Sequence, residues 1–221
     1  MKRDSHILPY YPIFLGISGK RCVVVGGGEI ALRKVRALIE HEAELKVISP
    51  ELCLELAQMA EKGVIMVLQR SYNDGDLEGA FMVIAATDDG KINGKVAREA
   101  RERGILVNVV DGPEQSTFIA PSYLRRGGLA IAVSTDGKSP ALARKIRTKL
   151  EKDFGAEYAS LVLMISEIRS DLKNQGIKIG GGTWQKAIDL DALPRMLKAG
   201  QSEKAKATLL ANLERLRRTK T

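Results

Sequence analysis

The sequence has few of the residues that mark disulfide-bonded, metal-binding or membrane-spanning proteins. Its 221 residues include two cysteines and two histidines. Cys22 and Cys53 are too few for a disulfide framework, so free thiols in a reducing compartment are expected. No Cys-x-x-Cys spacing or His/Cys/Asp cluster predicts a metal site. No stretch approaches the roughly 18 apolar residues of a membrane span, and the N-terminus lacks a signal-peptide cleavage pattern. We therefore expect a soluble cytoplasmic protein without a bound metal.

Aromatic residues are also scarce, at 5% of the chain, whereas basic residues are in excess. Residues 1–140 hold 18 basic and 18 acidic side chains, and residues 141–221 hold 17 and 9, so the net charge of +8 comes from the second segment. A nucleic-acid surface is one interpretation, but the few aromatics and the lack of a helix-turn-helix or RNA-binding pattern argue against it. A site for a polyanionic small molecule and an ordinary solvated helical surface remain open.

Strands and helices alternate along the first half of the chain. Each expected strand is an unbroken apolar run, which is typical of a parallel sheet covered on both faces. The fold class predicted is therefore α/β, a Rossmann-type doubly wound parallel sheet. The expected strands are 21–25, 44–49, 64–69, 80–87 and 105–111, and the expected helices are 29–41, 51–63 and 90–104.

The pattern changes after Asp111. Two short strands are expected around Gly127 and Gly128, and a helix is expected from Ser139 as N-cap. The rest is helical and basic, with the glycines at 180–182 interpreted as a linker. The helices expected there are 156–175, 183–199 and 201–218. We predict a Rossmann domain (1–112), a small β-β-α segment (113–150) and a helical C-terminal domain (151–221).

A glycine-rich motif follows the first expected strand. Gly26, Gly28 and Ala31 fit G-x-G-x-x-[G/A] between a strand and a helix, which is the context of a dinucleotide-binding turn. Gly26 would make the tight turn, Gly28 would admit a pyrophosphate, and Ala31 would allow close packing of helix and strand. The helix N-terminus would then offer free N–H groups to the phosphates. A tight turn without a ligand is the alternative interpretation.

Polar residues follow other strands at the same predicted edge of the sheet. The acidic residue usual after the second strand is absent; Ser49, Pro50 and Glu51 stand there, and no arginine follows, which favours NAD over NADP. Thr87 and Asp88 follow the fourth strand, and Asn108 and Asp111 lie at the end of the fifth. Capping of the next helix explains Asp88 or Asp89 as well as function does, whereas no helix directly follows Asp111.

Four stretches in order resemble the precorrin-2 dehydrogenases of sirohaem synthesis, a family that includes the N-terminal part of the multifunctional sirohaem synthases. These stretches are VVVGGGEIALRKVRAL, VIAATDDGKIN, VNVVDGPEQSTFIAPS and AIAVSTDGKSPALARKIR. The resemblance covers about residues 10–150, and the later helices match in placement and character. Since the sequence ends without the methyltransferase domain of the fused synthases, a stand-alone form is expected.

The resemblance implies a function and a site. It implies that the Rossmann domain binds NAD, that 113–150 forms an intertwined homodimer interface, and that the helical domain helps to wall a tetrapyrrole site. Precorrin-2 would lose a hydride to NAD and a proton, giving sirohydrochlorin. Asp111 matches the family's aspartate, which is proposed as general base. The cofactor contacts expected are Gly26, Gly28, Glu29, Ile30, Ser49, Pro50, Glu51, Thr87 and Asp88.

The substrate's charge fits the basic second half of the chain. Precorrin-2 carries eight carboxylate side chains, which arginine guanidinium groups can bind. This tetrapyrrole is therefore a better match than nucleic acid for the basic residues of the sequence. Neither nucleic acid nor a membrane is an expected partner. Ordinary surface charge is the alternative for each arginine. The substrate-binding residues predicted are Asn108, Arg125, Arg126, Arg144 and Arg147.

Two questions stay open from the sequence. Members with and without sirohydrochlorin ferrochelatase activity resemble the chain alike at Asp111, so a second, metal-inserting activity is undecided. Fused synthases can carry a phosphorylatable serine where this chain has Thr135, and whether Thr135 is modified is also open.

A different class, an NAD(H)-sensing regulatory module on the same fold, is the alternative function.

Overall fold

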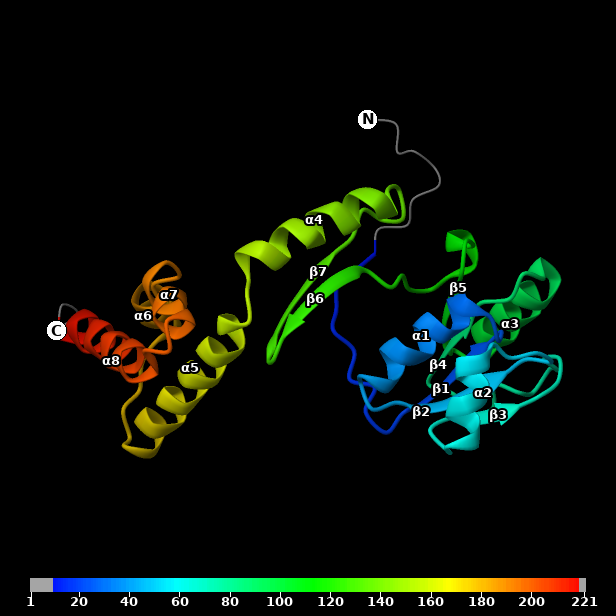
Figure 1. Ribbon diagram of the computed structural model, residues 1–221, viewed down its shortest axis with the longest axis horizontal. Helices are drawn as coiled ribbons and strands as arrows, with labels where there is room; N and C mark the ends of the chain where they lie inside the picture. Colours follow the sequence, from blue (N-terminus) through cyan, green and yellow to red (C-terminus); the bar gives the residue numbers. More distant parts are fainter. Residues whose placement is uncertain (1–9, 219–221) are drawn as a thin grey trace. The chain divides into compact units, whose positions relative to one another are not determined.

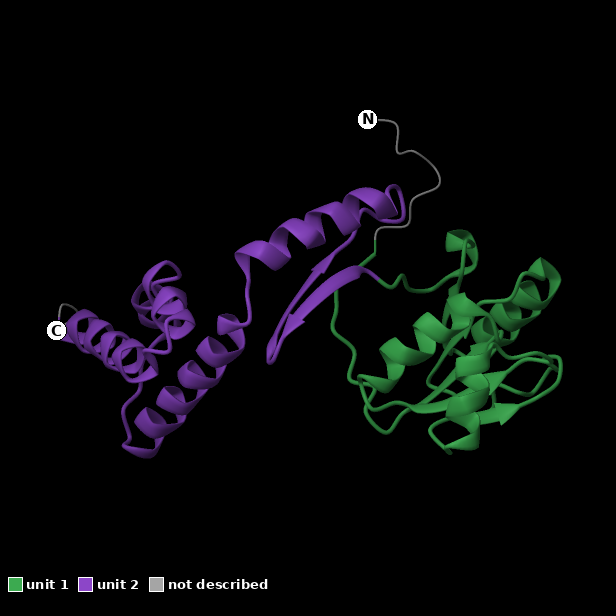
Figure 2. Cartoon of the chain, viewed as in Figure 1, with its two compact units in different colours: residues 1–120 green, residues 121–221 purple. Residues whose placement is uncertain are grey.

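The computed structural model describes residues 10–218 and divides the chain into two compact units. Unit 1 is Met1–Ala120 and unit 2 is Pro121–Thr221 (Figure 2). The sequence-based boundaries at 112 and 150 stay predictions, because they divide the chain by expected function, whereas the two units are defined by compactness.

Unit 1 is built on one five-stranded parallel sheet (Figure 1). The strand order is β3-β2-β1-β4-β5, with β1 in the centre. This confirms the predicted Rossmann-type fold. The strands are β1 Arg21–Val25, β2 Glu44–Ile48, β3 Met66–Leu68, β4 Met82–Ala85 and β5 Leu106–Val109.

Both faces of this sheet are buried, which explains why its strands are apolar throughout. In β1, Cys22 and Val24 belong to one hydrophobic cluster, and Val23 and Val25 belong to another. Successive side chains of a strand point to opposite faces, so each face has its own core. Burial raises the pKa of the Cys22 thiol to about 11, as expected for a structural cysteine.

The helices of unit 1 bury one stripe each against these faces. Helix α1 (Glu29–Ile39) contributes Val35 and Leu38 to the first cluster, which α2 (Leu54–Glu61) joins through Leu56. Helix α3 (Gly90–Glu102) contributes Val96, Ala97 and Ala100 to the second cluster. A 3-10 turn, η1 (Pro113–Gln115), follows β5.

A β-hairpin and a helix begin unit 2, as predicted. Strands β6 (Ser122–Arg126) and β7 (Leu129–Val133) pair antiparallel, and α4 (Pro140–Asp153) packs along them (Figure 1). The Ser139 hydroxyl accepts a hydrogen bond from Leu142 N, so the predicted N-cap is confirmed. Glycine is favoured at the hairpin turn because Gly127 has a φ of 55° and a Cβ there would lie 3.0 Å from the Ala159 Cβ.

Four further helices surround a third core in unit 2. Helix α5 buries Leu161, Met164 and Ile168, spaced to lie on one face, against Leu209 and Leu213 of α8. The helices are α5 Glu157–Asn174, α6 Gly181–Ala187, α7 Ala192–Lys198 and α8 Ser202–Arg218.

Two predictions for this region are wrong. The single helix expected at 183–199 is two helices, because Asp189 Oδ1 accepts hydrogen bonds from the N–H groups of Asp191 and Ala192, at 2.9 and 2.8 Å, and begins a new helix there. The expected linker 180–182 also forms part of a helix. Gly180 caps α6, and its carbonyl accepts a hydrogen bond from Thr183 N at 3.0 Å.

Within the described residues, no helix combines the length and the apolar character that crossing a membrane requires.

Candidate functional site

The predicted cofactor-binding residues and Asp111 follow strands that end at the carboxyl edge of the unit 1 sheet. Because all five strands are parallel, their C-terminal ends lie at one edge. The hydrogen-bond ladder extends one residue beyond the strands there: Gly26 N donates to Ile48 O at 2.9 Å, Ala86 N to Val25 O at 2.7 Å, and Val110 N to Ala85 O at 2.9 Å. The segments that follow β1, β2, β4 and β5 therefore start at the same level.

The first two glycines of the turn after β1 are required by close backbone contacts. Gly26 has φ 127°, and a Cβ there would lie 2.3 Å from the Ala86 carbonyl oxygen. Gly27 is tighter still, since its Cβ would lie 1.9 Å from the Glu51 carbonyl oxygen and 2.7 Å from Ser49 Oγ. The motif assigned no role to Gly27. The structure shows that it lets the turn pass under the segment after β2.

Gly28, in contrast, borders open space. A Cβ on Gly28 would meet no protein atom within 4 Å, and the residue is exposed. Gly28 is the N-cap of α1, and among residues 10–218 no side chain caps the first N–H groups of this helix. Helices α3 and α4 do have such caps, from Asp89 and Ser139. The amides at the start of α1 are thus available to an anion, and this fits the pyrophosphate of a dinucleotide.

The segment after β2 presents two exposed residues and one buried one. Pro50 and Glu51 are exposed, while Ser49 is 7% exposed. The Ser49 hydroxyl donates to the Glu51 carbonyl at 2.6 Å, so it holds this segment together and keeps only its acceptor capacity. Its contact with a ribose stays a prediction.

The segment after β4 resolves which aspartate caps α3. Asp89 Oδ1 accepts hydrogen bonds from Lys91 N and Ile92 N, at 2.7 and 3.3 Å, so Asp89 is the cap. Asp88 is exposed and is not the N-cap. Thr87 Oγ1 donates to Oδ1 of the buried Asn93 at 2.8 Å, and Asn93 Nδ2 donates to Thr87 O at 2.9 Å. This network fixes the segment that offers Asp88 to solvent.

Asp111 follows β5 in an unusual backbone conformation. Its φ is 61°, in the left-handed region that Asp and Asn adopt more readily than most residues, and it is exposed. Lys34 of α1 interacts with it electrostatically. Burial and the neighbouring charge of Arg33 lower the pKa of Lys34, and the charge of Asp111 opposes that shift. Lys34, which the motifs did not single out, is therefore a neighbour of the predicted catalytic residue.

Asn108 has an intramolecular role. It is 9% exposed in β5, and its Nδ2 donates to the Phe118 carbonyl at 3.1 Å. It therefore ties the chain leaving unit 1 to the sheet. This geometry lends no support to its predicted contact with substrate.

The four arginines predicted to bind substrate lie in unit 2, and they differ in whether their guanidinium groups already have partners within the protein. Arg126 Nε donates to the Phe154 carbonyl at 3.1 Å, and Arg147 forms an ion pair with Glu151. Arg125 Nε donates to the Gly127 carbonyl at 3.1 Å, while Arg144 is exposed on α4. Substrate contacts of all four remain predictions. Thr135 Oγ1, whose modification was left open, accepts a hydrogen bond from Ser139 N at 3.0 Å.

The part of the chain that the structure describes holds no group of three or more His, Cys, Asp or Glu side chains arranged to bind a metal ion. His41 follows the end of α1, and its Nδ1 lies 2.7 Å from the Ala37 carbonyl oxygen. His6 lies outside the described residues.

Comparisons with known proteins agree with this organisation. Residues 13–122 match a family model described as NAD(P)-binding, and residues 126–152 match one described as the central region of a sirohaem biosynthesis protein. The chain is similar to a solved structure named SirC, precorrin-2 dehydrogenase, with a TM-score of 0.67 and 23% identity, over 93% of this chain and 100% of that one. At this identity the likeness shows the fold.

Curated relatives share more of the sequence. A sirohaem synthase of Nitrosococcus oceani is 41% identical over 209 residues, which is 94% of this chain and 44% of the relative. One of Chromobacterium violaceum is 45% identical over 166 residues, or 75% and 35%. One of Pseudomonas aeruginosa is 43% identical over 166 residues, or 75% and 36%. The chain thus spans less than half the length of these relatives.

Proposed function

Since this chain belongs to the family of sirohaem-biosynthesis proteins that includes the sirohaem synthases, we propose that it is an NAD-dependent precorrin-2 dehydrogenase. The reaction is the oxidation of precorrin-2 to sirohydrochlorin. One observation carries the proposal: the open, uncapped turn at Gly28 and the carboxylate of Asp111 follow strands that end at the same edge of one sheet.

The residues after β1, β2 and β4 would hold the cofactor. Gly26 and Gly27 shape the turn, and Gly28, Glu29 and Ile30 lie where the pyrophosphate meets the start of α1. Ser49, Pro50 and Glu51 border the adenosine ribose, and Thr87 and Asp88 lie on the nicotinamide side. The exposed carboxylate of Glu51 disfavours a 2′-phosphate, which supports NAD over NADP. When bound, the nicotinamide supplies the hydride acceptor of the reaction.

Asp111 is proposed to accept the proton that the substrate loses. Removing two hydrogens from precorrin-2 takes a hydride and a proton, and an exposed carboxylate beside the substrate is a suitable acceptor for the proton. The left-handed backbone at Asp111 places this side chain at the start of the segment leaving the sheet. The side chain of Lys34 lies within electrostatic range of this carboxylate.

Unit 2 is proposed to supply the positive charge for the substrate's carboxylates. Arg144 is the best candidate, because Arg147 already forms an ion pair and Arg125 and Arg126 each bond to a carbonyl. We also propose that the protein is a homodimer joined through residues 113–150. The exposed apolar side chains of Leu142 and Ile146, on one face of α4, support a partner there.

Replacement of Asp111 by asparagine tests the proposed catalytic role. Asparagine tolerates the left-handed conformation, so Asp111→Asn removes the proton acceptor without straining the backbone. We expect turnover to fall by roughly a hundredfold or more, with NAD affinity unchanged. The measurement is anaerobic conversion of precorrin-2 with NAD, followed by sirohydrochlorin absorbance, together with calorimetric titration of NAD.

Asp136→Asn is the matched control, because Asp136 also has a positive φ of 51° but lies in a loop of unit 2. It should keep its turnover. Near-normal turnover of Asp111→Asn would remove Asp111 from the mechanism. Wild-type protein that binds NAD without oxidising precorrin-2 would instead favour an NAD(H)-sensing module.

A further inference from the structure

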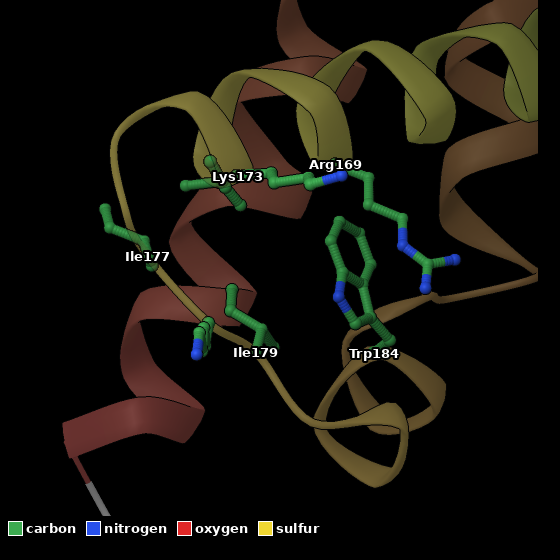
Figure 3. Close-up of a pocket in the computed structure, with 7 residues that line it drawn as sticks. Arg169, Lys173, Ile177, Ile179 and Trp184 are labelled. Carbon is green, nitrogen blue, oxygen red and sulfur yellow. The ribbon is translucent and has the colours of Figure 1, made fainter.

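Unit 2 contains a pocket that the proposed dehydrogenase reaction does not use. It has a volume of about 190 Å³ and lies between the C-terminal end of α5, the segment that follows it, and α6 (Figure 3). Its lining residues are Arg169, Leu172, Lys173, Ile177, Lys178, Ile179 and Trp184.

The floor of this pocket is apolar and partly fixed by the core. Leu172, Ile179 and Trp184 all pack against the hydrophobic cluster of unit 2. Figure 3 shows the indole of Trp184 standing between the side chains of Arg169 and Ile179. A flat apolar group bound there would be held by aromatic and aliphatic surface that is already in place.

The rim of the pocket carries uncompensated positive charge. Arg169, Lys173 and Lys178 line it, and no acidic side chain does. Within residues 10–218, none of these three forms an ion pair, whereas Arg147 and Arg218 of the same unit do. The Trp184 Nε1–H has no hydrogen-bond acceptor among the described residues, which leaves one further donor at the pocket. This combination is complementary to a carboxylate.

We propose that this pocket binds a carboxylate attached to a single flat ring, aromatic or pyrrolic. Size limits the occupant to one ring, because apolar cavities of about 150 Å³ are known to hold benzene. The carboxylate would lie among Arg169, Lys173 and Lys178, and the ring would lie on Trp184 and Ile179. The ring acid is either a free small molecule or one acidic ring at the edge of a larger polycarboxylate. The proposal does not require the dehydrogenase activity.

The sequence provides a specific reporter, because Trp184 is the chain's only tryptophan. The full chain is titrated with pyrrole-2-carboxylate and with benzoate while Trp184 fluorescence is followed, and benzamide serves as the neutral probe. We expect saturable changes with a dissociation constant of about 1 mM or tighter for the acids and none for benzamide. Uroporphyrin, an octacarboxylate tetrapyrrole, is tested by calorimetry because it absorbs light in the same range.

The double variant Arg169→Gln/Lys173→Gln should weaken binding of the acids at least about tenfold. Both side chains are exposed, so the variant should fold, and far-UV circular dichroism checks this. Lys149→Gln/Lys204→Gln removes the same charge from exposed positions of α4 and α8 and should bind like the wild type.

The source of the ligand is decided by the same titrations. Binding of the single-ring acids supports a free small molecule, and binding of uroporphyrin alone, lost in the pocket variant, supports the edge of a larger molecule. Binding of none of the acids, or binding equally strong in the pocket variant, overturns the proposal. No turnover is measured, so failure here leaves the proposed dehydrogenase reaction untouched.

Discussion

The chain contains two runs of three glycines, and the two units use them in different ways. At 26–28 in unit 1, the first two glycines are enclosed by backbone carbonyls that leave no room for a Cβ. At 180–182 in unit 2, a Cβ on any of the three would meet no atom within 4 Å, and the run simply starts a short helix. The same triple-glycine sequence is therefore sterically required in unit 1 and not in unit 2, because only in unit 1 does another backbone segment pass close to it.

The same contrast extends to how each unit is held together. Unit 1 has two clusters on the faces of one sheet, and its loops are fixed by buried polar groups. Unit 2 has one helical cluster and an exposed basic surface. Changes in unit 1 should thus cost more stability, and the predictions below test this from the largest effect to the smallest.

Gly27→Ala is expected to have the largest effect on stability. The new Cβ would lie 1.9 Å from a backbone oxygen of Glu51, so the turn or the segment after β2 must move. We expect unfolding to become easier by at least about 3 kcal/mol. Urea unfolding followed by circular dichroism measures this change.

Gly28→Ala is the matched control for this clash. Its Cβ meets no protein atom, so stability should stay within about 1 kcal/mol of the wild type. If a pyrophosphate approaches there, NAD affinity should nevertheless fall, as calorimetric titration would show. Equal losses of stability in the two variants would mean that the contrast between Gly27 and Gly28 is wrong.

Glu99→Gln tests the buried polar contacts of unit 1. Glu99 accepts hydrogen bonds from the Tyr72 hydroxyl and from Gly75 N, and Arg103 Nε lies 2.8 Å from its other oxygen. Burial acts to raise the pKa of Glu99, but these partners outweigh it and lower the pKa below its usual range. Loss of the charge should cost about 3 kcal/mol near neutral pH.

The sign of the pH dependence follows from this lowered pKa. The contribution of the ionised carboxylate is complete above the ordinary glutamate value of about 4.3 and is lost as the pH falls through the lower folded value. Wild-type stability should therefore drop more steeply below about pH 4.5 than that of Glu99→Gln. Urea unfolding at pH 3 to 7 measures it, with the exposed Glu102→Gln of the same helix as control.

Gly181→Ala should have the smallest effect, and it should be of opposite sign. The residue lies in the first turn of α6 with open space around it, and alanine is the better helix former. We expect a gain of up to about 1 kcal/mol. Trp184 fluorescence during urea unfolding reports on this helix. A loss as large as that of Gly27→Ala would contradict the comparison.

Local patterns predicted most of the architecture because they reflect burial. The unbroken apolar runs, such as Val23–Val25, predict a sheet covered on both faces, and the structure confirms it. The helix start predicted at Ser139-Pro140 is confirmed as well. The prediction failed where a side chain reshaped the local backbone. Asp189 divides the expected 183–199 helix by accepting hydrogen bonds from two N–H groups. The spacing of apolar residues does not reveal such a bond.

The candidate site shows the same division. The sequence by itself determined the glycine motif, the strands that precede Asp88 and Asp111, and the basic second half of the chain. Only the tertiary structure decided that Gly27 lies against Glu51, that Asp89 rather than Asp88 caps α3, and that Lys34 lies near Asp111. The Asp89 cap is a local contact that the sequence left open between two aspartates. The other two contacts join segments far apart in the chain, and packing of parallel strands, not local propensity, brings such segments together.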